Sequence, residues 1–238
     1  MAADAQAILS QLAIVAAERQ ARAADPQLDT SVLGLKAYQQ RRFARSYVDL
    51  LSSARYAAAA RFFLEELYGP KDFSDRDAQF ARVVPALVRL FPHELVETVS
   101  LLARLHALSE SLDTAMGRHL LGQLVDREAY VRAWILTGRS DARDEQIELT
   151  LAVGQDLDRL TRKPLLRTTL HLMRGPARAA GLGALQQFLE AGFDTFKAMG
   201  GAQPFLSTVG DREHALADAL FAWREGVALE TEPLGQLP

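Results

Sequence analysis

Histidine is the side chain best suited to proton transfer and metal binding near neutral pH, and this sequence of 238 residues contains five. His106, Glu110 and Asp113 are spaced i, i+4 and i+7, which places all three on one side of a helix. His119 follows about two turns further along the same helix. These four residues are therefore candidate ligands of a metal ion.

The plainer interpretation of the same four residues is a solvated or hydrogen-bonded helix edge. Di-iron carboxylate bundles use Glu-x-x-His pairs, and the sequence has none. His171, between Leu170 and Leu172, suggests a haem ligand in a helical pocket, although a lone histidine on an apolar helix is more often packed and hydrogen-bonded. The identity of any cofactor stays unknown at this stage.

Composition excludes several other kinds of chemistry. Because the sequence has no cysteine, thiol nucleophiles, iron–sulfur clusters and zinc–thiolate sites are ruled out. It also has no GxSxG elbow and no phosphate-binding GxGxxG or GKS motif. The net charge of −3 argues against nucleic acid as a partner. No apolar run approaches the roughly 20 residues of a spanning helix, so we expect no membrane segment and a cytoplasmic protein.

Alanine and leucine dominate the sequence and β-branched residues are sparse, which predicts an all-α fold. We expect a single domain over residues 1–238, an irregular bundle of about eight to ten helices. The helices predicted for residues 32–68 and 92–124 should lie at its centre. The helix of residues 1–25 is expected at the periphery, because Asp25 and Pro26 separate it from the rest. Residues 226–238, with two prolines, should form a loose tail.

The least generic stretch of the sequence is FFLEELYGPKDFSDRD, residues 62–77. Gly69 and Pro70 should end one helix, and Ser74 has the position of an N-cap for the next. The candidate binding residues of this corner are Tyr68, Lys71, Asp72, Phe73, Arg76 and Asp77. The alternative is a loop clamped by an ion pair from Arg76 to a nearby acid, with Phe73 buried.

This corner, together with the segment that begins MRGPARAAGLGALQQFLEAGF at Met173, resembles a group of uncharacterised bacterial all-helical proteins. The resemblance covers the middle of the chain and implies no activity. It adds nothing about chemistry.

Two hypotheses of function follow from the sequence. The first is a non-catalytic module that binds a protein partner or a second copy of itself, because an apolar core is predicted and a reactive constellation is not. Self-association is expected because the apolar stripe of Ile8, Leu12 and Val15 must dock on the bundle or on a twin subunit. The alternative is a metal- or haem-dependent protein that uses His106, Glu110, Asp113, His119 or His171. Whether the protein is an enzyme is undecided.

Overall fold

The computed structural model describes residues 2–67, 73–226 and 228–238, and within these ranges it contains helices and no strand, so the predicted all-α class is confirmed. The α-helices are α1 (Ala2–Ala23), α2 (Pro26–Ser46), α3 (Val48–Ser52), α4 (Ala57–Phe62), α5 (Ser74–Leu90), α6 (His93–Arg118), α7 (Arg127–Thr137), α8 (Ser140–Thr161), α9 (Pro164–Ala179), α10 (Gly183–Ala198) and α11 (Gln203–Ala222). A π-helical turn, Phe63–Leu67, follows α4, and a short 3-10 turn, Leu234–Gln236, lies near the C-terminus. No helix in the described part of the chain is long and apolar enough to cross a membrane.

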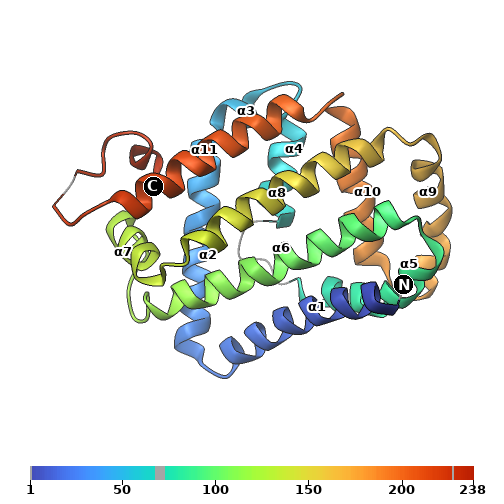
Figure 1. Cartoon of the computed structure of the whole chain (residues 1–238), viewed down its shortest axis with the longest axis horizontal. Coiled ribbons are helices and arrows are strands. Elements are labelled where there is room, and N and C mark those ends of the chain that lie inside the picture. Colours follow the sequence, from blue (N-terminus) through green and yellow to red (C-terminus); the bar gives the residue numbers. More distant parts are fainter. Residues whose placement is uncertain (1, 68–72, 227) are drawn as a thin grey trace.

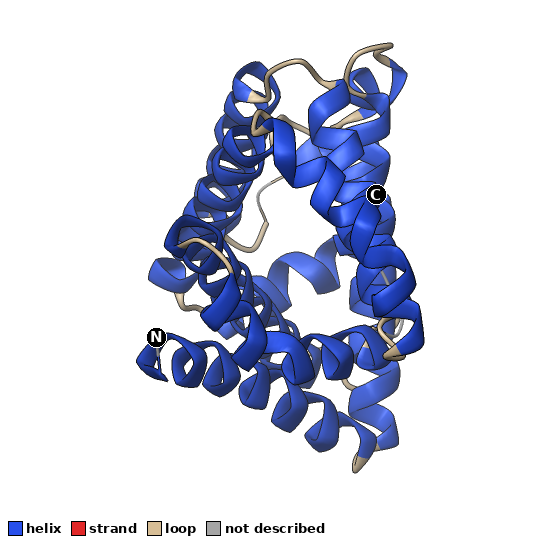
Figure 2. Cartoon of the chain, turned by 90° about the vertical axis from the view of Figure 1, so that its right-hand side faces the viewer, coloured by secondary structure: helices blue, strands red, loops and turns tan. Residues whose placement is uncertain are grey.

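Helix α6 lies at the centre of the fold, as the sequence predicts, and packs against α1, α2, α7 and α8. Figure 1 shows α1, α6, α8 and α11 as a row of neighbouring long helices that α2 crosses. Figure 2 shows that the end of the molecule formed by α5, α9 and α10 is almost entirely helical. The described chain has eleven α-helices rather than eight to ten, because one expected long helix is divided.

The helix expected over residues 32–68 begins earlier than predicted and is divided in its middle. Its first part, α2, begins at Pro26, because the carboxylate of Asp25 caps it by accepting hydrogen bonds from the backbone N–H groups of Gln27 and Leu28. The helix is interrupted at Tyr47 and again at Ser53, where the backbone is extended and the serine hydroxyl accepts N–H groups that helix would otherwise use. The expected stop at Gly69 and Pro70 lies outside the described residues.

Helix α1 is packed inside the fold rather than set apart from it. Ile8, Leu12 and Val15 are buried, and Ile8 and Leu12 join a core cluster with residues of α5 and α6 such as Val84 and Val96. The break at Asp25 and Pro26 therefore acts as a tight turn between α1 and α2, which contact each other. The apolar stripe that suggested self-association is already covered by the chain itself.

The C-terminal tail is also packed, which corrects the expectation of a loose segment. Leu229, Leu234 and Leu237 are buried in the same core cluster as residues of α2, α7 and α11. The guanidinium of Arg127 donates to the carbonyl of Leu237 at 2.7 Å, and the hydroxyl of Tyr38 donates to the carbonyl of Pro238. Leucine burial and these donors hold the tail in place, in spite of its prolines.

Candidate functional site

Half of the predicted corner can be placed. Tyr68, Lys71 and Asp72 lie outside the described residues, whereas Phe73 immediately precedes α5 and Arg76 and Asp77 lie in its first turn. Phe73 is half-buried. The N-cap expected at Ser74 is wrong by one residue, because α5 begins at Ser74 and the capping position belongs to Phe73, which makes no side-chain cap hydrogen bond.

Arg76 lies between two aromatic rings and joins α5 to α10. Its guanidinium carbon is 4.0 Å from the ring centroid of Phe73 and 4.4 Å from that of Phe188, and its Nε is 3.6 Å from Oδ1 of Asp77. The expected ion pair from Arg76 to a neighbouring acid is thus present. With only 14% of its side chain exposed, this arginine is positioned to clamp two helices through cation–π contacts.

Asp77 connects the corner to the histidine predicted as a candidate ligand. Its Oδ2 lies 2.8 Å from Nε2 of His106 on α6 and 2.7 Å from Nη2 of Arg19 on α1. Burial raises the pKa of Asp77, but the hydrogen bond from His106 and the charge of Arg19 outweigh burial, so the pKa lies below its ordinary value. The corner and the central helix therefore share one polar cluster.

The second half of this cluster surrounds Glu110. Nη2 of Arg22 is 2.6 Å from one carboxylate oxygen of Glu110, and Nζ of Lys36 is 2.7 Å from the other. One turn along α6, Asp113 accepts a hydrogen bond from Nε2 of Gln39 at 3.1 Å and lies 3.9 Å from Nζ of Lys36. We call the whole set the buried charge network, and its ionisable members are Arg19, Arg22, Lys36, Asp77, His106, Glu110 and Asp113.

The environment shifts the pKa values of the two acids on α6, Glu110 and Asp113, in opposite directions. Burial opposes ionisation of Glu110, but Lys36 and Arg22 more than compensate and lower its pKa to about 2. Burial raises the pKa of Asp113, and the nearby charge of Glu110 raises it further, although Lys36 opposes both. Two carboxyl groups with divergent proton affinities are a pattern found in acid–base sites. Here, however, Glu110 is 4% and Asp113 is 8% exposed, so a substrate would have to separate packed helices to reach them.

The metal-site prediction is not supported by this geometry. The structure brings His106, Glu110 and Asp113 onto one side of α6, but their neighbours are the cations of α1 and α2. His119 is exposed at the end of α6, and His171 is exposed on α9. Among the described residues, no group of three or more His, Asp or Glu side chains is placed to bind a metal ion.

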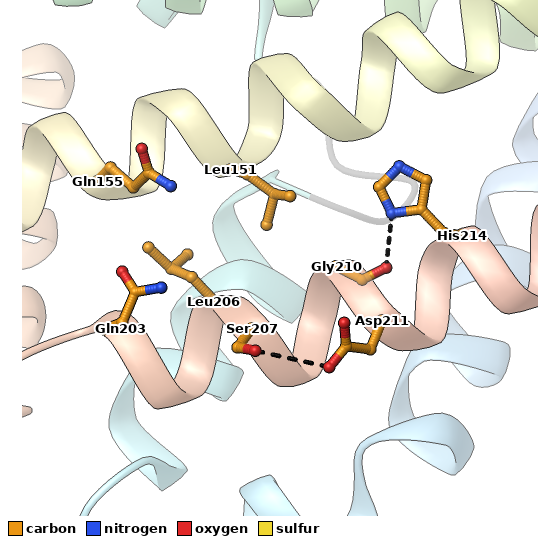
Figure 3. Close-up of a pocket in the computed structure, with 8 residues that line it drawn as sticks. All are labelled: Leu151, Gln155, Gln203, Leu206, Ser207, Gly210, Asp211 and His214. Atoms are coloured by element: carbon orange, nitrogen blue, oxygen red, sulfur yellow. Dashed lines mark hydrogen bonds between the residues drawn. The ribbon is translucent and has the colours of Figure 1, made fainter.

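A small pocket of about 180 Å³ between α8 and α11 contains the residue types of a serine hydrolase (Figure 3). Ser207 faces Asp211 directly, with 3.5 Å between the hydroxyl and the carboxylate, while Nδ1 of His214 donates to the carbonyl of Gly210 at 2.8 Å. In a catalytic triad the histidine lies between the serine and the acid. The imidazole of His214 is turned away from both, so the three residues do not form a triad.

An open apolar groove of about 540 Å³ lies where α7 and α11 end. Figure 1 shows these two helix ends next to each other, away from α5 and α9. Ile135, Leu136 and Trp223 form its walls, together with Arg132, Arg224 and Glu225. Arg224 donates to the backbone carbonyls of Phe221, Ala222 and Trp223 at the end of α11, and Arg132 is 3.3 Å from Glu128. Arg132 and Arg224 therefore already have partners within the protein.

Helix α9 exposes large apolar side chains to solvent. It is strongly amphipathic, yet Leu165 is 77% and Leu172 is 73% exposed, and Met173 and Pro176 are exposed as well. The opposite side of the helix is tied to α10, because Arg167 pairs with Asp194 at 3.0 Å and Arg174 pairs with Glu190 at 2.6 Å. Ala177 is the buried residue of α9 among those described, and Leu165 and Leu172 lie outside this packed side.

A comparison with protein-family models matches residues 18–226 to a domain of unknown function (DUF8198). The chain belongs to this family. The match extends from the end of α1 to the end of α11, and so includes the buried charge network and α9. Searches of the curated proteins and of the solved structures found no match.

Sequence reasoning identified the acids and the histidine of the buried charge network and missed its cations. Arg19 and Arg22 continue the helical spacing of Ile8, Leu12 and Val15 on α1, so the apolar stripe itself indicates that both arginines face the packed side. The exposed leucines of α9 were also missed. Their helical spacing is visible in PLLRTTLHLMRGPA, but the spacing cannot say which part of the apolar side faces the bundle.

Proposed function

We propose that this protein is a non-catalytic interaction module of the cytoplasm, and that the exposed apolar side of α9 is its binding surface. The observation that carries the proposal is the exposure of Leu165 and Leu172 on a helix whose opposite side pairs with α10. An amphipathic helix normally buries its apolar stripe. An apolar surface that a fold leaves uncovered commonly marks a site of protein association.

The charged and polar clusters support a binding role over a catalytic one. The acids of the buried charge network are neutralised by neighbouring cations, and their position between α1, α2, α5 and α6 suits a structural fastening. The pocket between α8 and α11 holds a serine, an acid and a histidine that are not aligned for proton transfer. A cytoplasmic location is compatible with a sequence that has no cysteine to form disulfides.

Site-specific photo-cross-linking in the cells that produce the protein tests this proposal. A photoreactive amino acid in place of Leu172 should give discrete adducts with another polypeptide, because a partner on α9 would lie against that side chain. The matched control places the same amino acid at Leu124, which is 92% exposed between α6 and α7. Equal adducts at both positions, or none at position 172, would show that α9 is not a specific binding surface.

A second variant separates binding from folding. Leu165→Glu should remove the adducts at position 172 while the helical circular dichroism and the melting temperature stay close to those of the parent chain, because Leu165 contributes little to the core. Adducts that persist in Leu165→Glu would contradict a binding surface along α9.

A further inference from the structure

We infer that the C-terminal tail, residues 228–238, is a displaceable strap, and that the same segment of a second copy of this chain can take its place. The tail lies on α2, α7 and α11, with its leucines buried in the core cluster that these helices share. Figure 1 shows this end of the chain beside α7 and α11. The inference concerns a surface other than that of α9, so it is independent of the proposed function.

The contacts that hold the tail are those of a docked peptide. Arg127 on α7 donates to the carbonyls of Leu229 and Leu237, at 3.5 and 2.7 Å. The hydroxyl of Tyr38 on α2 donates to the carbonyl of Pro238 at 3.3 Å. All of these acceptors are backbone atoms. Recognition of extended peptides commonly combines main-chain hydrogen bonds with pockets for a few side chains, and the buried leucines of the tail supply such side chains.

The rest of the tail is weakly attached. Its regular structure among the described residues is limited to the 3-10 turn Leu234–Gln236, and Glu230 and Glu232 are exposed. Ordering such a segment costs conformational entropy that a few leucines and hydrogen bonds must offset. We therefore expect the tail to open locally while the helices stay folded. Gly226, with a φ of 88°, lies between α11 and the tail and suits a hinge.

The surface beneath the tail belongs to the family domain. The family match includes α2, α7 and α11 and stops at residue 226, before the tail. Because the tail leucines share a core cluster with Leu35, Trp134 and Leu220 of these helices, an open tail would leave an apolar surface. The structure shows one segment that fits this surface, namely the tail, which a second copy of the chain also carries. Exchange of an identical element between two copies is a low-cost route to a dimer.

Thiol labelling of the full chain tests whether the tail opens by itself. The sequence has no cysteine, so Leu234→Cys places the single thiol of the chain in the tail, at a position that is 6% exposed. The matched control is Leu220→Cys, which places the thiol on α11 in the same core cluster. A thiol reagent should modify Leu234→Cys at least about tenfold faster than Leu220→Cys, because local opening requires less free energy than unfolding of the helices. Equal rates would overturn the strap.

A fluorescent peptide of residues 228–238 tests the exchange between copies, since it carries the tail without the rest of the chain. It is titrated into the full chain and into a full-length variant with both Leu234→Glu and Leu237→Glu, whose own tail should stay open. Fluorescence anisotropy should show binding to this double variant at least about tenfold tighter than to the parent chain, because an attached tail competes at a high effective concentration. A peptide with Leu237→Glu should bind neither protein.

Substitutions on α7 locate the bound peptide. In the double variant, Arg127→Ala should weaken peptide binding about tenfold, because hydrogen bonds from a guanidinium to the peptide carbonyls are charge-assisted. Arg132→Ala on the same helix should leave the binding unchanged, because Arg132 pairs with Glu128. Peptide binding that is equal for the parent chain and the double variant, or that Arg127→Ala does not weaken, would overturn the exchange.

Circular dichroism separates loss of binding from loss of folding. Absence of peptide binding to a double variant that keeps its helical signal would overturn the exchange. If the double variant lost that signal, the decisive measurement would be the labelling of Leu234→Cys with excess peptide present. The peptide should accelerate that labelling by holding the attached tail open, and an unchanged rate would overturn the exchange.

Discussion

Arg22 on α1 and Glu110 on α6 lie side by side in the core, with 2.6 Å between Nη2 of the arginine and Oε2 of the glutamate. The same arginine donates to the hydroxyl of Thr114 at 2.7 Å. Both charged residues are nearly inaccessible to water, so each depends on the other to offset the loss of hydration. This contact fastens the first helix of the chain to the central one.

Removal of one partner from this pair should be strongly destabilising. We expect Arg22→Ala to lower the free energy of unfolding by about 3 kcal/mol, because Glu110 would keep Lys36 but lose its closest cation. Urea denaturation measures the change. The control is Arg159→Ala, which breaks pairs with Glu94 and Asp156 from a side chain that is 57% exposed and should cost less than about 1 kcal/mol. Equal losses in the two variants would mean that the buried pair contributes no more than a surface one.

The opposite pKa shifts on α6 predict different pH responses for two matched substitutions. The pKa of Glu110 is lowered from 4.5 to about 2, so its stabilisation is present above pH 4.5 and is lost as pH falls toward 2. Glu110→Gln should therefore lower the free energy of unfolding at pH 7 by about 3 kcal/mol and flatten its decline between about pH 5 and pH 2.

Asp113→Asn is the counterpart to that substitution. The pKa of Asp113 is raised from 3.8, so its contribution is greatest below that pH and is lost as pH rises through the pKa of the folded chain. An uncharged amide at this position should change the free energy of unfolding at pH 7 by less than about 1 kcal/mol, and the acid decline should persist. Chemical denaturation across the pH range compares the two. If Asp113→Asn proved the more harmful at neutral pH, the assigned directions would be reversed.

Arg76 should resist conservative replacement because its planar guanidinium contacts two rings at once. Arg76→Ala should lower the free energy of unfolding by about 2 kcal/mol through loss of the contacts with Phe73 and Phe188. Arg76→Lys should recover less than half of this, since an ammonium cannot stack on two faces. Asp77 keeps Arg19 and His106 in both variants and is not left unpaired. Thermal melts that show full rescue by lysine would indicate that charge alone matters.

Replacement of two helical glycines by alanine should change the stability of the protein in opposite directions. A Cβ at Gly117 would lie 2.4 Å from Cγ2 of Val32, where α6 and α2 approach closely, and a β-branched side chain has little freedom to move aside. We expect Gly117→Ala to destabilise by about 1 to 3 kcal/mol. A Cβ at Gly175 on α9 would meet nothing within 4 Å, so Gly175→Ala should stabilise by about 0.5 to 1 kcal/mol through the helix preference of alanine. Melting temperatures that move in the same direction would refute the packing argument.

Several local features could be predicted from the sequence because they depend on neighbouring residues. Asp126 caps α7 through the backbone N–H of Ala129, and Gly138 ends the same helix with a positive φ of 60°. The all-α class and the central position of α6 also follow from composition and apolar periodicity. The interruption between α2 and α3 at Tyr47 could not be predicted in this way. Tertiary contacts stabilise the interruption. Arg212 of α11, for example, donates to the carbonyl of Ser46 at 2.7 Å.

The candidate site shows the same contrast between features set by neighbouring residues and features set by distant ones. The shared side of His106, Glu110 and Asp113 on one helix is predictable from their spacing alone, because an α-helix has 3.6 residues per turn. Their neighbours depend on the packing of distant helices, since Arg22 and Lys36 are 88 and 74 residues away from Glu110 along the chain. A set that resembles metal ligands became a neutralised network once those cations were packed against it. The exposure of Leu165 and Leu172 depends likewise on tertiary packing, because helical periodicity does not encode which part of the apolar side of α9 packs on α10.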